Sequence, residues 1–145
     1  MKTLEWRCVN GGGFVRRSID FVSRGTVCHV EFLVDGQTLG ARADGGVKYR
    51  PIDPFPVDFR FKAELPDEQW QKVMDFLSAQ IGKPYDYSAI MGILLNHDWE
   101  NEGSWYCSEL WAAALQAGQV IGPFPKAVKN VTPQDALLIS FAMGF

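Results

Sequence analysis

Three side chains in this sequence have the chemistry of a thiol-dependent acyl-transfer site: Cys107, His29 and Glu31. A cysteine thiolate is a strong nucleophile and a histidine can take the thiol proton. A carboxylate can then orient the histidine and stabilise its charged form. The three cysteines and two histidines of the chain do not follow the spacing of a zinc site. Because the three residues lie far apart along the chain, the chemistry depends on the elements that carry them.

Cys107 is predicted at the start of a helix. From Cys107 onward, apolar residues follow the i, i+3, i+4, i+7 and i+8 spacing of one helix face. Ser104 is a candidate N-cap, and Gly118 is a candidate for the residue that follows the last turn. The N–H groups and the dipole at this end favour a negative charge, which promotes the thiolate form of a cysteine. Taken alone, Cys107 can also be a small apolar residue buried in a core helix.

His29 and Glu31 are predicted on one strand, residues 26–34. This stretch is rich in β-branched and aromatic residues and ends at an Asp-Gly hairpin turn. Side chains alternate between the two faces of a strand, so His29 and Glu31 share one side, one pleat apart. A buried histidine and a buried carboxylate need bonding partners. Either the two residues form part of a site, or both lie solvated on the open face of a half-buried sheet.

The rest of the pattern predicts an α+β domain. Residues 51–56 contain three prolines and are predicted to be an irregular connection. Thr132 and Pro133 have the residue types of an N-cap and a first helical position. The other expected elements are strands over residues 4–9, 37–42, 47–50 and 57–63, and helices over residues 14–22, 66–81, 87–95 and from 133 to about 142.

Composition limits the class of protein. The 145 residues suit a single domain, and with 47% apolar and 21% charged residues the chain is globular rather than disordered. A net charge of −3 without a basic run argues against nucleic acid as a partner. No apolar stretch is long enough to span a bilayer, and the first residues lack the apolar centre of a signal peptide. An odd number of scattered cysteines predicts a reducing compartment without a disulfide framework.

Several short motifs resemble one family in their order along the chain. Residues 82–85 (Gly-Lys-Pro-Tyr), a helix, and then residues 107–108 (Cys-Ser) resemble the G-x-P-Y … C-S motif of the NlpC/P60 cysteine peptidase superfamily. In most of that superfamily the histidine follows the cysteine, whereas here it precedes it. This order resembles the circularly permuted branch, the YiiX/YaeF-like papain-like amidases, which also includes lecithin:retinol acyltransferase-like proteins. The resemblance spans about residues 14–140.

The resemblance implies a single permuted NlpC/P60-like domain over residues 1–145, with a papain-like α+β fold. In this fold a central antiparallel sheet or partial barrel packs against the helix that carries Cys107. The resemblance makes Cys107 the nucleophile and His29 the base. Tyr85 matches a tyrosine that lines the site, and its hydroxyl is expected to donate to an oxyanion or to the substrate carbonyl.

The third catalytic position departs from the family pattern. Permuted members often carry this polar residue on the strand after the histidine strand, where residues 39–42 offer neither a carboxylate nor a histidine. The role is therefore assigned to Glu31, with Asp44 as the alternative. Arg42 has three interpretations: it neutralises Glu31 across the hairpin, it binds a substrate carboxylate, or it is a plain surface arginine.

The function implied is a cysteine amidase or peptidase that works through a thioester and needs neither a cofactor nor a metal. Peptide-like amides, including peptidoglycan stem peptides, and acyl groups are the expected substrates. Two alternatives remain: an acyltransferase or thioesterase of the same fold, and an inactive binding or structural module. A bacterial cytoplasmic or phage-borne protein is expected. The sequence leaves the oligomeric state open.

Overall fold

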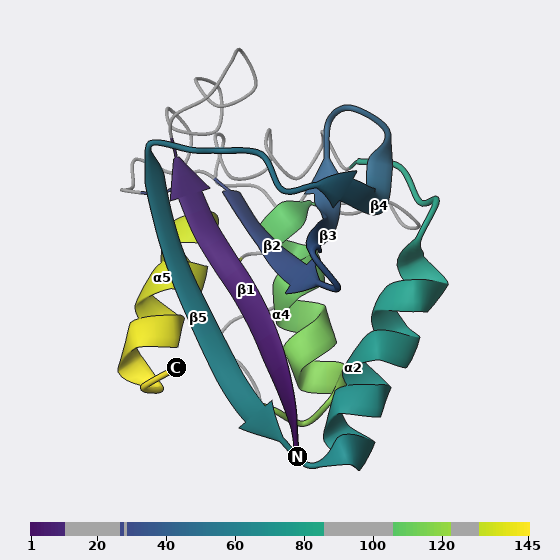
Figure 1. Cartoon of the computed structure of the whole chain (residues 1–145), viewed down its shortest axis with the longest axis vertical. Coiled ribbons are helices and arrows are strands. Elements are labelled where there is room, and N and C mark those ends of the chain that lie inside the picture. The colour runs from purple at the N-terminus through teal and green to yellow at the C-terminus, as the bar shows by residue number, and fades with distance from the viewer. Residues whose placement is uncertain (11–26, 28, 86–105, 123–130) are drawn as a thin grey trace.

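The computed structural model describes residues 1–10, 27, 29–85, 106–122 and 131–145 (Figure 1). The helices predicted over residues 14–22 and 87–95 lie outside the described residues. Within the described part, the elements are β1 (Lys2–Asn10), β2 (His29–Val34), β3 (Gln37–Arg42), β4 (Gly46–Pro51), β5 (Val57–Leu65), α2 (Asp67–Gln80), α4 (Cys107–Ala117) and α5 (Pro133–Ala142).

The strands form one antiparallel sheet in the order β4-β3-β2-β1-β5 (Figure 1). The register of β1 and β2 ends with Val9 opposite His29, so the histidine lies at one end of the sheet. An antiparallel sheet covered by helices confirms the predicted α+β class. The permuted papain-like arrangement stays a prediction.

One face of the sheet is apolar, and α4 and α5 cover it (Figure 1). Trp6 of β1 is fully buried there, with its ring centroid 6.1 Å from that of Trp111 and 5.1 Å from that of Phe145. Its Nε1 donates to Ser140 Oγ at 2.9 Å, which satisfies the polar end of the indole inside the core. The sheet pairing places Trp6 beside Phe32, so the apolar face of β2 is the face that meets the helices.

Two contacts fix the position of α4. The helix ends at Gly118, as predicted, and a side chain there would collide with Val73 Cγ2 of α2, at 2.3 Å from the added Cβ. At the other end, Ser108 Oγ donates a hydrogen bond to the Val131 carbonyl oxygen, just before α5. The start of α4 is therefore held against the segment that leads into α5.

The turns and helices of the structure lie close to where the sequence predicts them, and the helix ends differ by one residue. Asp35 and Gly36 have positive φ angles of 49° and 75°, as the predicted hairpin turn requires. Helix α2 begins one residue after the predicted start, because Pro66 is its N-cap with an extended ψ of 144°. Ile81 is the last residue of the predicted helix. In the structure it is the C-cap residue and is 42% exposed, since the helix has ended before it.

The strands lie where the sequence predicts them, but some of their first and last residues differ from the prediction. Of the strand predicted over residues 26–34, the described part runs from His29 to Val34, and residues 26 and 28 lie outside the described residues. The strand predicted over 57–63 continues to Leu65. Pro51 was placed in the irregular connection but is the last residue of β4, where a missing N–H is tolerated. Helix α5 begins at Pro133 as predicted, with Thr132 Oγ1 accepting the Asp135 N–H at 3.1 Å.

Candidate active site

Cys107 is the first residue of α4 and is buried, with 1% of its surface exposed. The N-cap of this helix is Tyr106. The sequence predicted Ser104 for that role, and Ser104 lies outside the described residues. The Glu109 carboxylate helps to cap the helix, because its Oε1 accepts the Tyr106 N–H at 3.3 Å. The sulfur thus lies at the end of the helix where the dipole favours negative charge.

His29 is the first residue of β2, at the end of the sheet where α4 begins (Figure 1). Its Nε2 lies 2.9 Å from Glu31 Oε2. Cys107 is the other group that acts on this side chain, because it is among the causes that raise the pKa of His29. The structure therefore brings together the three residues for which the sequence predicted catalytic roles.

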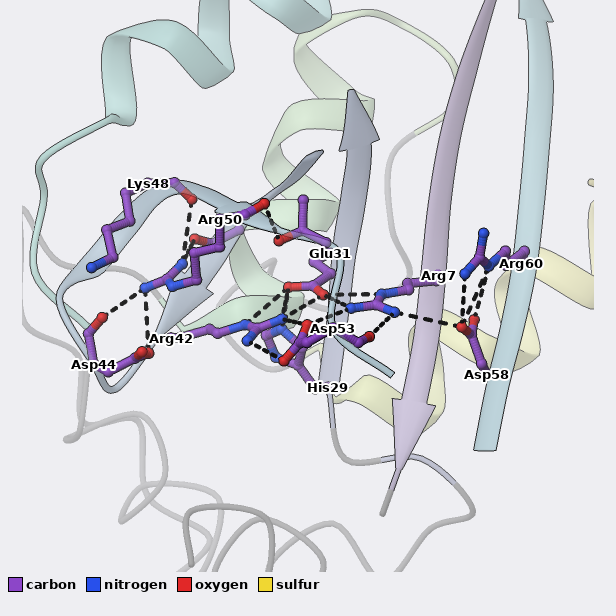
Figure 2. Close-up of polar contacts among 12 residues, drawn as sticks. Arg7, His29, Glu31, Arg42, Asp44, Lys48, Arg50, Asp53, Asp58 and Arg60 are labelled. Carbon is purple, nitrogen blue, oxygen red and sulfur yellow. Dashed lines mark hydrogen bonds and ion pairs between the residues drawn. The ribbon is translucent and has the colours of Figure 1, made fainter. Parts of the chain in front are cut away.

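Glu31 is completely buried, so the solvated interpretation of this strand face is wrong. The Glu31 carboxylate lies between two arginines (Figure 2). Arg7 donates to Oε1 through Nε and Nη2, at 3.0 and 2.7 Å. Arg42 donates to Oε1 through Nη2 at 2.7 Å, and to Oε2 through Nη2 and Nε at 2.9 and 3.1 Å. The ion pair between Arg42 and Glu31 across the hairpin is one of the predicted roles of Arg42.

A second carboxylate, from the proline-rich connection between β4 and β5, also binds the two arginines. Asp53 Oδ1 accepts from Nη2 of Arg7 and from Nη2 of Arg42, each at 2.9 Å (Figure 2). The ring of Phe55 lies 5.1 Å from the guanidinium carbon of Arg7 and 5.8 Å from that of Arg42. We call Arg7, Glu31, Arg42 and Asp53 the arginine–carboxylate cluster.

The charges of the site shift the pKa values of its two central groups in opposite directions. Burial disfavours a charged His29, but the Glu31 carboxylate and the Cys107 sulfur outweigh burial and raise the pKa of His29 to about 9. Burial also disfavours a charged Glu31, but His29 and Arg42 outweigh it and hold the pKa of Glu31 well below its usual range. At neutral pH, Glu31 is an anion and His29 is an imidazolium that can donate to Cys107.

Tyr85 lies beside the start of α4. Its ring is buried and makes an edge contact with the Tyr106 ring, with centroids 6.0 Å apart. The residues before it are tied to β4, because the Lys83 carbonyl accepts the Val47 N–H at 2.9 Å. Gly46 permits this approach, since an added Cβ there would lie 2.1 Å from the Lys83 oxygen. Tyr85 is thus held next to the residue that precedes Cys107.

Asp44, the alternative for the third catalytic position, lies elsewhere. Its carboxylate is 75% exposed and pairs with Arg50 at 3.4 Å, at the turn between β3 and β4 (Figure 2). The Arg50 guanidinium also donates to backbone carbonyls around that turn. Asp44 therefore belongs to a hairpin contact, and Glu31 is the carboxylate that meets His29.

Three residues of the site were not predicted from the sequence: Arg7, Asp53 and Phe55. A signal was available for Arg7, because it lies in a predicted strand on the same side as Glu5 and Val9 and must find a partner if that side is buried. Its partner depends on the register that places it opposite Glu31. Asp53 and Phe55 gave no comparable signal, since an irregular segment between prolines does not reveal which face of the sheet it covers.

Within the described residues, no three His, Cys, Asp or Glu side chains lie close enough together to hold a metal ion. In the same part of the chain, no helix has the length and apolar character needed to cross a membrane. No protein-family model matches this chain, and no curated protein matches it. The resemblance to permuted NlpC/P60 proteins therefore stays a prediction.

Proposed function

We propose that the protein is a cysteine hydrolase of the papain-like type, acting on peptide-like amides through Cys107, His29 and Glu31. The observation that carries the proposal is the pair of groups that act on the imidazole of His29. One ring nitrogen meets a buried carboxylate at 2.9 Å, and a cysteine at a helix N-terminus is among the groups that raise the pKa of the same imidazole. A cysteine, a histidine and a group that orients the histidine make up the site of a thiol nucleophile.

The reaction would proceed in two steps. In the first, the Cys107 thiolate attacks the amide carbonyl carbon, and the His29 imidazolium gives its proton to the leaving amine as the C–N bond breaks. This leaves a thioester on Cys107 and a neutral imidazole. In the second, His29 takes a proton from water, and the resulting hydroxide attacks the thioester. The acid leaves, and the S–C bond breaks to restore the pair of sulfur and imidazolium.

Two further groups are assigned to the substrate. The backbone N–H of Cys107 and the Tyr85 hydroxyl would donate to the oxyanion that forms during attack. The contact between the Tyr85 and Tyr106 rings supports this assignment, because it holds Tyr85 next to the nucleophile. Arg42 is 17% exposed, and within the described residues its Nη1 has one partner, Asp53 Oδ2 at 2.9 Å. The second Nη1 hydrogen would bind a carbonyl or carboxylate of the substrate.

Alkylation across pH tests the nucleophile directly. Iodoacetamide should label Cys107 nearly as fast at pH 6 as at pH 8, because an imidazolium beside the sulfur maintains the thiolate. An ordinary thiol with a pKa of about 8.5 would react roughly 75-fold more slowly at pH 6. Intact mass gives the overall rate, and peptide mapping separates Cys107 from Cys8 and Cys28. Burial and the nearby Cys107 raise the pKa of Cys8 well above its usual value, so Cys8 should stay unlabelled.

The variants complete this test. His29→Ala should abolish the fast reaction at pH 6, and Cys107→Ser should remove the label from the peptide that contains position 107. With a library of peptide and acyl-ester substrates, the wild type should accumulate a mass shift equal to the acyl group, and Cys107→Ser should not. Labelling of Cys107 at pH 6 at the rate of an ordinary thiol would leave the protein without an activated nucleophile, as an inert module would be. An acyl shift from esters alone, without amide cleavage, would point to an acyltransferase or thioesterase.

A further inference from the structure

Arg7 uses every N–H of its guanidinium inside the protein. Nε and Nη2 donate to Glu31 Oε1, and Nη2 also donates to Asp53 Oδ1. Nη1 donates to the Asp53 carbonyl oxygen at 2.8 Å and contacts Asp58 Oδ2 at 3.5 Å. A guanidinium has five N–H donors, so these contacts occupy all of them. Because the side chain is also fully buried, Arg7 has no donor to offer a substrate.

The contacts to Glu31 divide its two oxygens between different partners. Arg7 meets Oε1 only, His29 meets Oε2 only, and Arg42 meets both. The terminal torsion of a glutamate is soft and has no sharply preferred angle. The contact with His29 therefore needs a second restraint on the carboxylate. Arg7 provides one from a fixed position, because it lies directly opposite Glu31 in the pairing of β1 with β2.

We propose that Arg7 is a positioning residue of the active site, which holds Oε1 of Glu31 so that Oε2 faces the imidazole of His29. This inference rests on the proposed function, since it assigns a role within that site. Arg7 itself touches no reacting atom. Its effect passes through Glu31 to the orientation of His29, and from there to the sulfur of Cys107.

The pKa of His29, followed by NMR of its ring protons, distinguishes positioning from simple charge. If Arg7 acted only as a nearby positive charge, Arg7→Met would raise the pKa of His29, because a repulsive neighbour is lost. If Arg7 positions Glu31, the same change loosens the carboxylate and lowers that pKa toward 6.5. The ratio of imidazolium to imidazole at a given pH then falls tenfold for each unit by which the pKa falls. We expect the lower pKa, together with slower alkylation of Cys107 at pH 6.

Arg7→Lys covers the case in which Arg7→Met does not fold. Lysine keeps the charge, but one ammonium cannot occupy both the Nε and the Nη2 contacts to Oε1. We expect Arg7→Lys to fold and to lower the pKa of His29 in the same direction. Arg60→Met is the matched control, because Arg60 faces Arg7 across β1 and β5 but is 56% exposed and bonded to Asp58. It should titrate like the wild type.

A double variant tests whether the effect passes through Glu31. Glu31→Gln and Arg7→Lys should each slow alkylation at pH 6, and the pair together should be no slower than Glu31→Gln alone. Multiplied effects, a raised pKa of His29 or wild-type behaviour of Arg7→Lys would overturn the positioning role. Labelling of the wild type separates this inference from the proposed function. If Cys107 is labelled fast at pH 6 in the wild type and equally fast in the Arg7 variants, only the positioning role of Arg7 is wrong. If Cys107 of the wild type reacts at the rate of an ordinary thiol, the proposed function is wrong as well.

Discussion

Glu31 has three cationic partners on two oxygens, which is more positive charge than one carboxylate can neutralise. Asp53 supplies the second negative charge, so the two arginines and two carboxylates of the cluster cancel. The Glu31 carboxylate and Cys107 are the two groups that raise the pKa of His29. At the scale of single residues, a cluster without net charge thus leaves the imidazolium as the positive charge beside Cys107.

Glu31→Gln should destabilise the fold strongly. Glutamine has the same shape, but its amide nitrogen is a donor and would face groups that are donors themselves, while the arginines lose their counter-charge. Removing one partner of a buried ion pair costs about 3–5 kcal/mol. We expect a loss of this size in the free energy of unfolding, measured with urea.

Glu64→Gln is the comparison for that loss. Glu64 is exposed on β5 and accepts a hydrogen bond from Thr3 at 2.7 Å. Its replacement should change the unfolding free energy by no more than about 0.5 kcal/mol. Equal losses in the two variants would mean that burial of the Glu31 charge carries no special cost.

At the scale of elements, the sequence predicted the features that are set by residues adjacent in the chain, such as strand alternation, turns and helix starts. The alternation of residues 57–63, the Asp-Gly turn and the start of α5 at Pro133 all lie where they were expected. The shared side of His29 and Glu31 follows from strand period alone. The partners of Glu31 do not follow from strand period. Arg7 lies beside Glu31 because of the register between β1 and β2, and Asp53 joins the cluster from a proline-rich connection. Distant pairing of this kind leaves no periodic trace in the sequence.

The approach of residues 82–85 to β4 gives a prediction at this scale. Gly46 has a φ of 73°, and an added Cβ would lie 2.1 Å from the Lys83 carbonyl oxygen. Gly36 has a φ of 75° but nothing within 4 Å of its added Cβ. Gly36→Ala should therefore cost only the left-handed backbone conformation, about 1–2 kcal/mol. Gly46→Ala should cost clearly more in urea unfolding, because the contact that supports Tyr85 must also open. Equal costs would show that this close approach is not needed.

At the scale of the whole molecule, the site links stability to pH. His29 has a folded pKa of about 9 against an ordinary value of 6.5. It therefore contributes stability that is complete below pH 6.5 and is lost as the pH rises through 9. Glu31 has a lowered pKa, so its contribution is present above its ordinary value of 4.5 and is lost in more acidic solution. Both contributions are present together between about pH 4.5 and 6.5.

Urea unfolding of Cys107→Ser at pH 6 and pH 9.5 should therefore reveal a loss of up to about 3 kcal/mol. The serine variant is used because ionisation of the thiol over this pH range would offset the loss in the wild type. The double variant Cys107→Ser, His29→Ala should have a much flatter profile, because the titrating imidazole has been removed. Parallel profiles for the two variants would mean that His29 is neutral in the folded protein at pH 6. In that case the same imidazole could not maintain a thiolate on Cys107. The predicted pH dependence of stability and the predicted fast alkylation of Cys107 would then both be wrong.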